Sequence, residues 1–166
     1  KRIIYLDPAQ QATPDDYDDQ KVYTSAANSL SLALAEDVRL EGIIGNRQLS
    51  LCQSVWELLE YKGIRYPATF SERTGLYDAM FNKIKNDKMS TMSKDSLMAI
   101  CVGLGLNAYA LTRLAEKASI HLNRDRMPDG MYLTLLERFP GLSLCDANGI
   151  LEAQGLAPLG SVDRSR

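Results

Sequence analysis

The segment that decides the fold runs from Pro67 to Leu106 and reads PATFSERTGLYDAMFNKIKNDKMSTMSKDSLMAICVGLGL. Pro67 suits the first turn of a helix, and Gly75 follows only eight residues later, so this helix is short. Gly75 permits a left-handed turn into the next helix, while the small side chain of Ser71 lets the two helices approach closely. The second helix has an apolar inner face formed by Leu76, Met80, Phe81 and Ile84.

Further helices are predicted on both sides of this segment. Apolar residues recur at helical spacing over about 22–40, 49–61 and 132–139. Ser93, Asn107 and Ser143 each precede an apolar run and are expected to be N-cap residues, while Gly63 and Gly155 are placed to end helices. No alternating strand pattern competes beyond the first few residues. The sequence therefore predicts an all-α fold.

The N-terminal part has a different composition. Residues 3–6 form a short apolar run that suits a strand or a hydrophobic anchor, and residues 7–19 contain five aspartates and two prolines, typical of an exposed acidic linker. We expect three regions: an N-terminal arm, linker and helix (1–47), a central domain (48–118) and a C-terminal helical extension (119–166). Because the first residue is Lys1, we expect a processed or trimmed chain.

Composition excludes several classes of function. The formal net charge is -2, with residues 62–88 at +3, which argues against a protein coated with nucleic acid and allows one DNA-facing surface. The common hydrolase, kinase and zinc-site motifs are absent, His121 is the only histidine, and three separated cysteines are expected to be buried thiols: Cys52, Cys101 and Cys145. We expect no enzymatic activity, no cofactor and no bound metal. No apolar run could span a membrane, so we expect a cytoplasmic protein.

The segment from Pro67 to Leu106 resembles the helix-turn-helix of the phage-repressor (Cro/Xre-like) family, and residues 119–166 resemble the C-terminal helical extension of some bacterial Xre-like proteins. The resemblance implies a repressor-like five-helix bundle in which Tyr77 to Asn86 lies in the major groove. Asn82 and Lys83 would contact base edges, and Lys85 and Lys88 phosphates. The full set of DNA-binding residues that it implies is Arg73, Tyr77, Asp78, Ala79, Asn82, Lys83, Lys85, Asn86 and Lys88.

Two positions depart from the family pattern. Pro67 and Asp78 stand where the family often has glutamine, and an acidic side chain at position 78 repels phosphate although it can accept from cytosine. The leading hypothesis is a bacterial or phage-type transcriptional regulator that binds double-stranded DNA as a homodimer. The alternative is a helical protein-interaction module, an accessory or inhibitory partner that reuses the helix-turn-helix packing.

Overall fold

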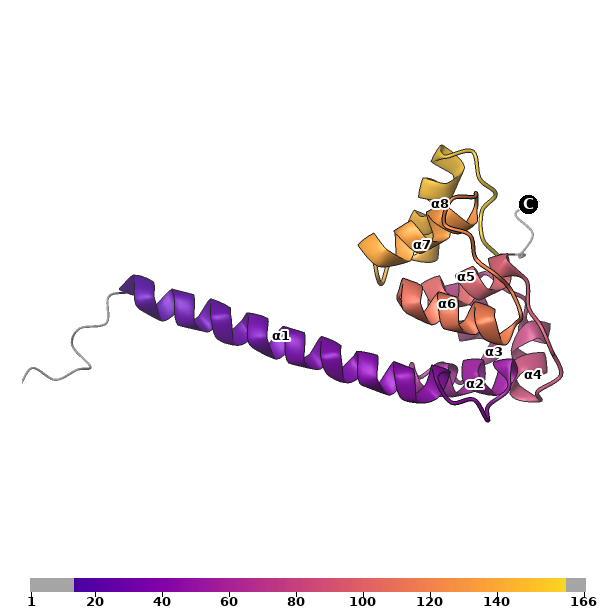
Figure 1. Cartoon of the computed structure of the whole chain (residues 1–166), viewed down its shortest axis with the longest axis horizontal. Helices are drawn as coiled ribbons and strands as arrows, with labels where there is room; N and C mark the ends of the chain where they lie inside the picture. Colours follow the sequence, from indigo (N-terminus) through magenta and orange to yellow (C-terminus); the bar gives the residue numbers. More distant parts are fainter. Residues whose placement is uncertain (1–13, 161–166) are drawn as a thin grey trace, which may run out of the picture. The chain divides into compact units, whose positions relative to one another are not determined.

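The computed structural model describes residues 14–160, and over this range it contains eight α-helices and no strand (Figure 1). The predicted all-α fold is therefore confirmed. The helices are α1 (Pro14–Ile44), α2 (Leu51–Tyr61), α3 (Pro67–Thr74), α4 (Asp78–Lys85), α5 (Lys94–Gly103), α6 (Ala108–Lys117), α7 (Asp129–Arg138) and α8 (Leu144–Ala153). The chain divides into two units, residues 1–39 and 40–166. No described helix is long and apolar enough to cross a membrane.

Helix α1 forms the described part of the first unit and continues into the second with residues 40–44. The helix predicted over 22–40 is confirmed, but α1 begins earlier. The acidic linker predicted over 7–19 is wrong from residue 14 onward, because a helix begins at Pro14, and proline suits the first turn of a helix. Residues 1–13, including the predicted strand or anchor at 3–6, lie outside the described residues.

The second unit contains both the predicted central domain and the predicted extension. Its first helix, α2, starts with a reciprocal cap: the Ser50 hydroxyl accepts from the Gln53 N–H (3.1 Å), and the Gln53 side chain accepts from the Ser50 N–H (3.0 Å). Gly63 follows the helix with a φ of 73°, as predicted. The two predicted domain boundaries, at 47/48 and at 118/119, both fall inside this unit, and they stay predictions.

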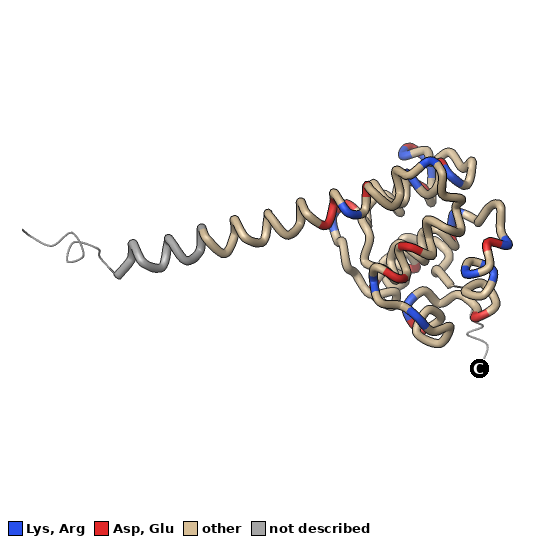
Figure 2. Tube along the Cα trace, turned by 90° about the horizontal axis from the view of Figure 1, so that it is seen from below, with Lys and Arg blue, Asp and Glu red and all other residues tan. Residues whose placement is uncertain are grey.

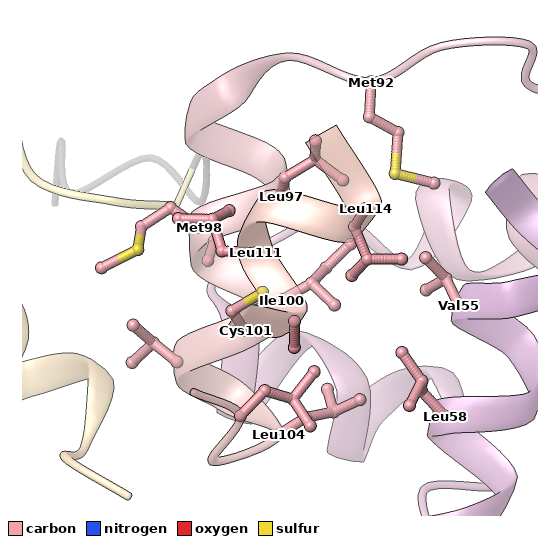
Figure 3. Packing of buried hydrophobic residues seen from close by; sticks show 14 of the residues in the cluster. Val55, Leu58, Met92, Leu97, Met98, Ile100, Cys101, Leu104, Leu111 and Leu114 are labelled. Atoms are coloured by element: carbon pink, nitrogen blue, oxygen red, sulfur yellow. The ribbon is translucent and has the colours of Figure 1, made fainter. Parts of the chain in front are cut away.

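Helix α5 lies at the centre of the core. It packs against α3, α6 and α8, and for this reason every side chain from Leu97 to Cys101 is completely buried. Figure 3 shows this region, where Ile100 and Leu97 from α5 approach Leu114 from α6 and the α2 residues Val55 and Leu58. A helix buried on all sides is uniformly apolar, in contrast to the amphipathic pattern of surface helices.

The extension is joined to α5 by a buried carboxylate. Asp129 at the start of α7 accepts from the Lys94 ammonium (2.8 and 3.0 Å) and from the Asn123 N–H (2.8 Å). Burial alone raises the pKa of the Asp129 carboxyl, but these hydrogen bonds and the Lys94 charge outweigh burial and hold the pKa below its usual range. The Tyr132 hydroxyl also donates to Asp95 (2.8 Å). The start of α7 is thereby fixed to the start of α5.

Two predictions about the extension need correction. The predicted apolar stripe over 132–139 includes Phe139, but α7 ends at Arg138, and Phe139 lies past the end of the helix with 51% of its surface exposed. Cys145 was expected to be buried, yet it is exposed because it lies in the first turn of α8. Cys52 and Cys101 are buried as predicted, and burial raises the pKa of the Cys101 thiol to about 12.

After α8 the chain returns to the turn between α3 and α4. The buried Asn148 side chain donates to the Leu159 carbonyl (3.0 Å) and accepts from the Leu159 N–H (2.7 Å), which fixes this return segment. The segment then passes so close to Gly75 that a Cβ atom there would lie 3.1 Å from the Gly160 Cα and 2.9 Å from a Leu144 methyl group. The extension therefore packs directly on the turn between the two helices that the sequence singled out.

Candidate DNA-binding surface

The turn between α3 and α4 has the conformation that the sequence predicted. Pro67 occupies the first position of α3, and Gly75 caps the helix with a φ of 68°, its N–H donating to the Ser71 carbonyl (2.8 Å). The buried Thr74 hydroxyl donates to the Phe70 carbonyl (2.7 Å) and accepts from the Leu76 N–H (3.2 Å). The N–H groups of Gly75 and Leu76 are thus satisfied, and the turn holds α4 at a defined angle to α3.

Ser71 does more than allow the two helices to approach. Its hydroxyl lies 2.5 Å from the Leu76 carbonyl and 2.6 Å from a carboxylate oxygen of Asp78, and its single proton serves one of these acceptors at a time. Asp78 is the first residue of α4, where a negative charge also suits the helix dipole. The contact between Ser71 and Asp78 was not predicted from the sequence. This contact gives Asp78 a role inside the motif, which explains an acidic residue at the start of the helix.

The inner face of α4 is fixed by aromatic packing. Phe81 is 2% exposed, and its ring centroid lies 5.4 Å from that of Trp56 on α2 and 5.6 Å from that of Phe70 on α3. Leu76 and Ile84 are buried beside it. Helices α2, α3 and α4 therefore meet at Phe81, and the apolar face predicted for α4 is the face that packs against α2 and α3.

The outer face of α4 is accessible, and its exposed side chains are those predicted from the sequence: Tyr77, Asp78, Ala79, Asn82, Lys83, Lys85 and Asn86. Within the part of the chain that the structure describes, the side chains of Asn82 and Lys83 have no hydrogen-bond or ionic partner. Asn86 instead donates its amide to the Asn82 carbonyl (2.7 Å) and closes the end of α4. Asn82 and Lys83 are therefore the polar groups of α4 that are most available to a ligand.

The cations around α4 differ in their surroundings. The Lys85 ammonium lies 5.9 Å from the centroid of the Trp56 ring, a cation–π geometry that directs it toward α2. Lys88 is exposed just after α4, following Asp87, which accepts from the Ser50 hydroxyl (2.6 Å) and ties this loop to α2. Arg73 is exposed at the end of α3, where it lines a cavity of about 580 Å³ between α3, the α5–α6 turn and the start of α8. Arg73 thus lies beside the extension.

The starts of α3 and α4 share a property that the sequence analysis did not identify. Side chains cap α2, α5, α6 and α8, whereas α3, α4 and α7 begin without a side-chain cap, α3 after Tyr66 and α4 after Tyr77. Both tyrosines are exposed, at 70% and 54%. The first N–H groups of a helix carry partial positive charge and bind anions such as phosphate, and tyrosine hydroxyls also contact phosphate. Tyr66 joins the candidate residues for this reason.

Other chemistry has little support in the described residues. No three side chains of His, Cys, Asp or Glu come together there as a metal site. His121 is exposed in the loop after α6.

A short helix, a left-handed glycine turn and a second helix with an apolar inner face and a polar outer face define a helix-turn-helix protein. Residues 54–108 match the family model of the Cro/C1-type helix-turn-helix DNA-binding domain, which covers most of α2 and all of α3, α4 and α5. The chain thus contains such a domain, with further helices after it, and no catalytic family matches. No curated protein and no solved structure matches the chain.

Proposed function

We propose that the protein is a transcriptional regulator that reads double-stranded DNA with the helix Tyr77 to Asn86. The observation that carries this proposal is the pairing of a rigidly packed inner face on α4 with an exposed outer face where Asn82 and Lys83 lack partners within the described chain. A side chain that reads bases needs both a fixed helix and an uncommitted polar end.

Each residue has an expected role. Asn82 and Lys83 contact base edges, with Asp78, Ala79 and Asn86 around them on the same face, and the Tyr77 hydroxyl at the start of α4 contacts a phosphate. Lys85, Lys88 and Arg73 contact phosphates, and the uncapped starts of α3 and α4 add backbone N–H groups. One short helix reads only a few base pairs, so we expect a homodimer on two half-sites. A cytoplasmic location and a bacterial or phage origin remain predictions.

The first test is fluorescence anisotropy of a labelled random-sequence duplex at low and at physiological salt. Wild type should bind in a strongly salt-dependent manner, and Lys85→Ala should weaken binding and reduce the slope of log K against log salt by about one. Arg126→Ala is the matched control, because Arg126 is an exposed cation in the loop before α7. Equal losses in both variants would assign the effect to net charge and would contradict the proposed surface.

The second test concerns sequence reading. A selection from random duplexes supplies the preferred site, on which Asn82→Ala should cost about 1–3 kcal/mol while binding to random DNA changes little. An equal loss on every duplex would remove Asn82 from the reading role. No binding even at low salt would favour the alternative, a protein-interaction module, for which the exposed apolar side chains of α1 would be the first surface to examine.

A further inference from the structure

A second cavity, of about 360 Å³, lies where the loop between α1 and α2 meets the end of α6. No residue of α3 or α4 lines it, so it is separate from the outer face of α4. Small-molecule sites in proteins have volumes of about 300–1,000 Å³, and this cavity lies within that range. The function proposed above makes no use of it.

Three cations and one carboxylate line this cavity. The cations are Arg47 from the loop and Arg113 and Lys117 from α6, and the carboxylate belongs to Glu116. Arg113 and Glu116 neutralise each other, because an Arg113 nitrogen donates to the Glu116 carboxylate at 2.6 Å. The positive charges of Arg47 and Lys117 therefore remain, in a chain whose formal net charge is -2 (Figure 2).

No carboxylate is paired with either of the two remaining cations. Arg47 is exposed, and within the described residues its guanidinium takes part in no hydrogen bond or ion pair. The Lys117 ammonium donates to the carbonyls of Asn46 (2.7 Å) and Leu49 (3.0 Å), which uses two of its three N–H groups. Burial, together with the charge of Arg113, lowers the pKa of Lys117, as expected for an ammonium without a compensating anion.

Two further carboxylates lie near the cavity but already have partners. Glu41, next to the lining residue Gly45, accepts from the Tyr109 hydroxyl. Asp87 accepts from the hydroxyl of Ser50, another lining residue, at 2.6 Å. These carboxylates reduce the positive potential, but neither lines the cavity. The charged groups within reach of a ligand are therefore predominantly cationic.

The remainder of the cavity wall is mostly apolar. Ile44 and Leu51 are buried, and Leu49 is half-buried beside them. Leu51 is also the first residue of α2, and the first N–H groups of a helix have no acceptor within the helix. A cavity that combines cations with apolar side chains is suited to a small organic molecule that carries an anionic group.

We propose that this cavity binds a small phosphate monoester. Such a group carries a charge of about -1.5 to -2 at neutral pH, which matches the two cations that lack a carboxylate partner. The Arg47 guanidinium binds the phosphate oxygens through paired hydrogen bonds, and Lys117 binds them as a point charge. The apolar side chains of the wall contact the organic part of the ligand. This site does not depend on the function proposed for α4.

The test is isothermal titration calorimetry of the full chain with phenyl phosphate in a phosphate-free buffer. Wild type should bind with a dissociation constant of about 1 mM or lower, and Arg47→Ala should raise that constant about tenfold. Thermal unfolding of Arg47→Ala should match wild type, because the Arg47 side chain makes no contact that folding requires. Lys88→Ala is the matched control, an exposed cation outside the cavity, and should bind as wild type does. No binding at about 10 mM, or equal losses in both variants, would overturn the proposal.

Two further probes test the chemistry of the ligand. Benzoate carries a ring and a single charge, and inorganic phosphate carries the charge without an apolar part, so both should bind several-fold more weakly than phenyl phosphate. Equal affinity for benzoate would overturn the requirement for a dianion. Equal affinity for inorganic phosphate would reduce the site to one for the inorganic ion and would overturn the claim for a monoester.

Phosphate groups also occur in the DNA backbone, and a DNA-binding measurement distinguishes the two sources. In phosphate-free buffer, Arg47→Ala should bind random duplex as tightly as wild type, whereas Lys85→Ala should bind it more weakly. A loss for Arg47→Ala as large as that for Lys85→Ala would assign the cavity to the DNA backbone and overturn the small-molecule claim. The calorimetry needs no DNA, so failure of the proposed function leaves its result readable.

Discussion

The two sides of the turn at Gly75 use their polar groups differently. On the side of the extension, the Ser143 hydroxyl caps α8 and the Asn148 amide binds both backbone groups of Leu159. On the outer side, α3 and α4 begin without side-chain caps, and Asn82 and Lys83 have no partner within the described chain. The first side has used its polar groups for folding. The second side leaves its polar groups accessible, and this contrast is the basis on which we propose Asn82 and Lys83 as binding residues.

The largest expected effect is a loss of stability when the packing of the inner face of α4 is disrupted, because this packing fixes the position of the outer face. Phe81→Ala should lower the free energy of unfolding by about 3–5 kcal/mol, because a completely enclosed ring between Trp56 and Phe70 is replaced by a cavity. Urea denaturation followed by circular dichroism measures this loss. Ala79→Ser on the outer face is the control and should change stability little. A loss below about 1 kcal/mol for Phe81→Ala would show that α4 is anchored elsewhere.

The next effect concerns the extension side. Asn148→Ala should lower the free energy of unfolding by about 2–3 kcal/mol, because it leaves the buried N–H and carbonyl of Leu159 without their partner. Binding of random duplex by the folded protein should stay the same, which anisotropy can check. Gln154→Ala, at the exposed end of α8, is the matched control. A loss of DNA affinity without a loss of stability would place Asn148 among the binding residues and remove the contrast.

A smaller effect is expected on the outer side. Tyr77→Phe removes one exposed hydroxyl and should weaken DNA binding by about 1 kcal/mol on every sequence, because phosphate contacts carry no base information. Thermal unfolding should be unchanged. Tyr109→Phe serves as the control, since its hydroxyl donates to Glu41 outside the motif. If Tyr77→Phe and Tyr109→Phe both bind DNA as tightly as wild type does, the Tyr77 hydroxyl makes no phosphate contact.

The smallest effect that we expect is on the pH dependence of the free energy of unfolding, through the protonation of Asp129 at acidic pH. Because its pKa is depressed in the folded protein, the stability that it provides is present above the unfolded-state pKa of about 3.9 and is lost as pH falls through the lower folded-state value. Denaturation curves at pH 7 and pH 3 should therefore differ more for wild type than for Lys94→Met. Arg124→Met removes the exposed ion pair with Glu137 and should behave like wild type. Equal pH dependence in wild type and Lys94→Met would contradict this role of Asp129.

Local features of the fold were predictable from the sequence because they depend on neighbouring residues. Ser93, Asn107 and Ser143 cap their helices as expected, and Gly75 takes the left-handed conformation. The outer face of α4 followed from helical periodicity, and its exposure is as predicted. The roles of these residues in binding DNA stay predictions.

Features that depend on distant residues were not predictable in the same way. The pairing of Asn148 with Leu159 joins a helix to a return segment that has no periodic pattern, and the Ser71 contact with Asp78 depends on the angle between two helices. Phe139 looks apolar in sequence, but the position where α7 ends decides its exposure. Tyr66 was missed because an absent cap becomes visible only when the start of each helix is known.

The contact of Gly75 with Gly160 has a consequence for the order of folding. It closes a chain loop of about 85 residues, and a nascent protein grows from its N-terminus at about 5–20 residues per second. The helices that match the Cro/C1-type domain leave the ribosome well before the residues that cover their turn. Packing of Leu144 and burial of Leu159 against that turn must wait until residue 160 has been synthesised, and a chain interrupted before that residue would present the turn uncovered.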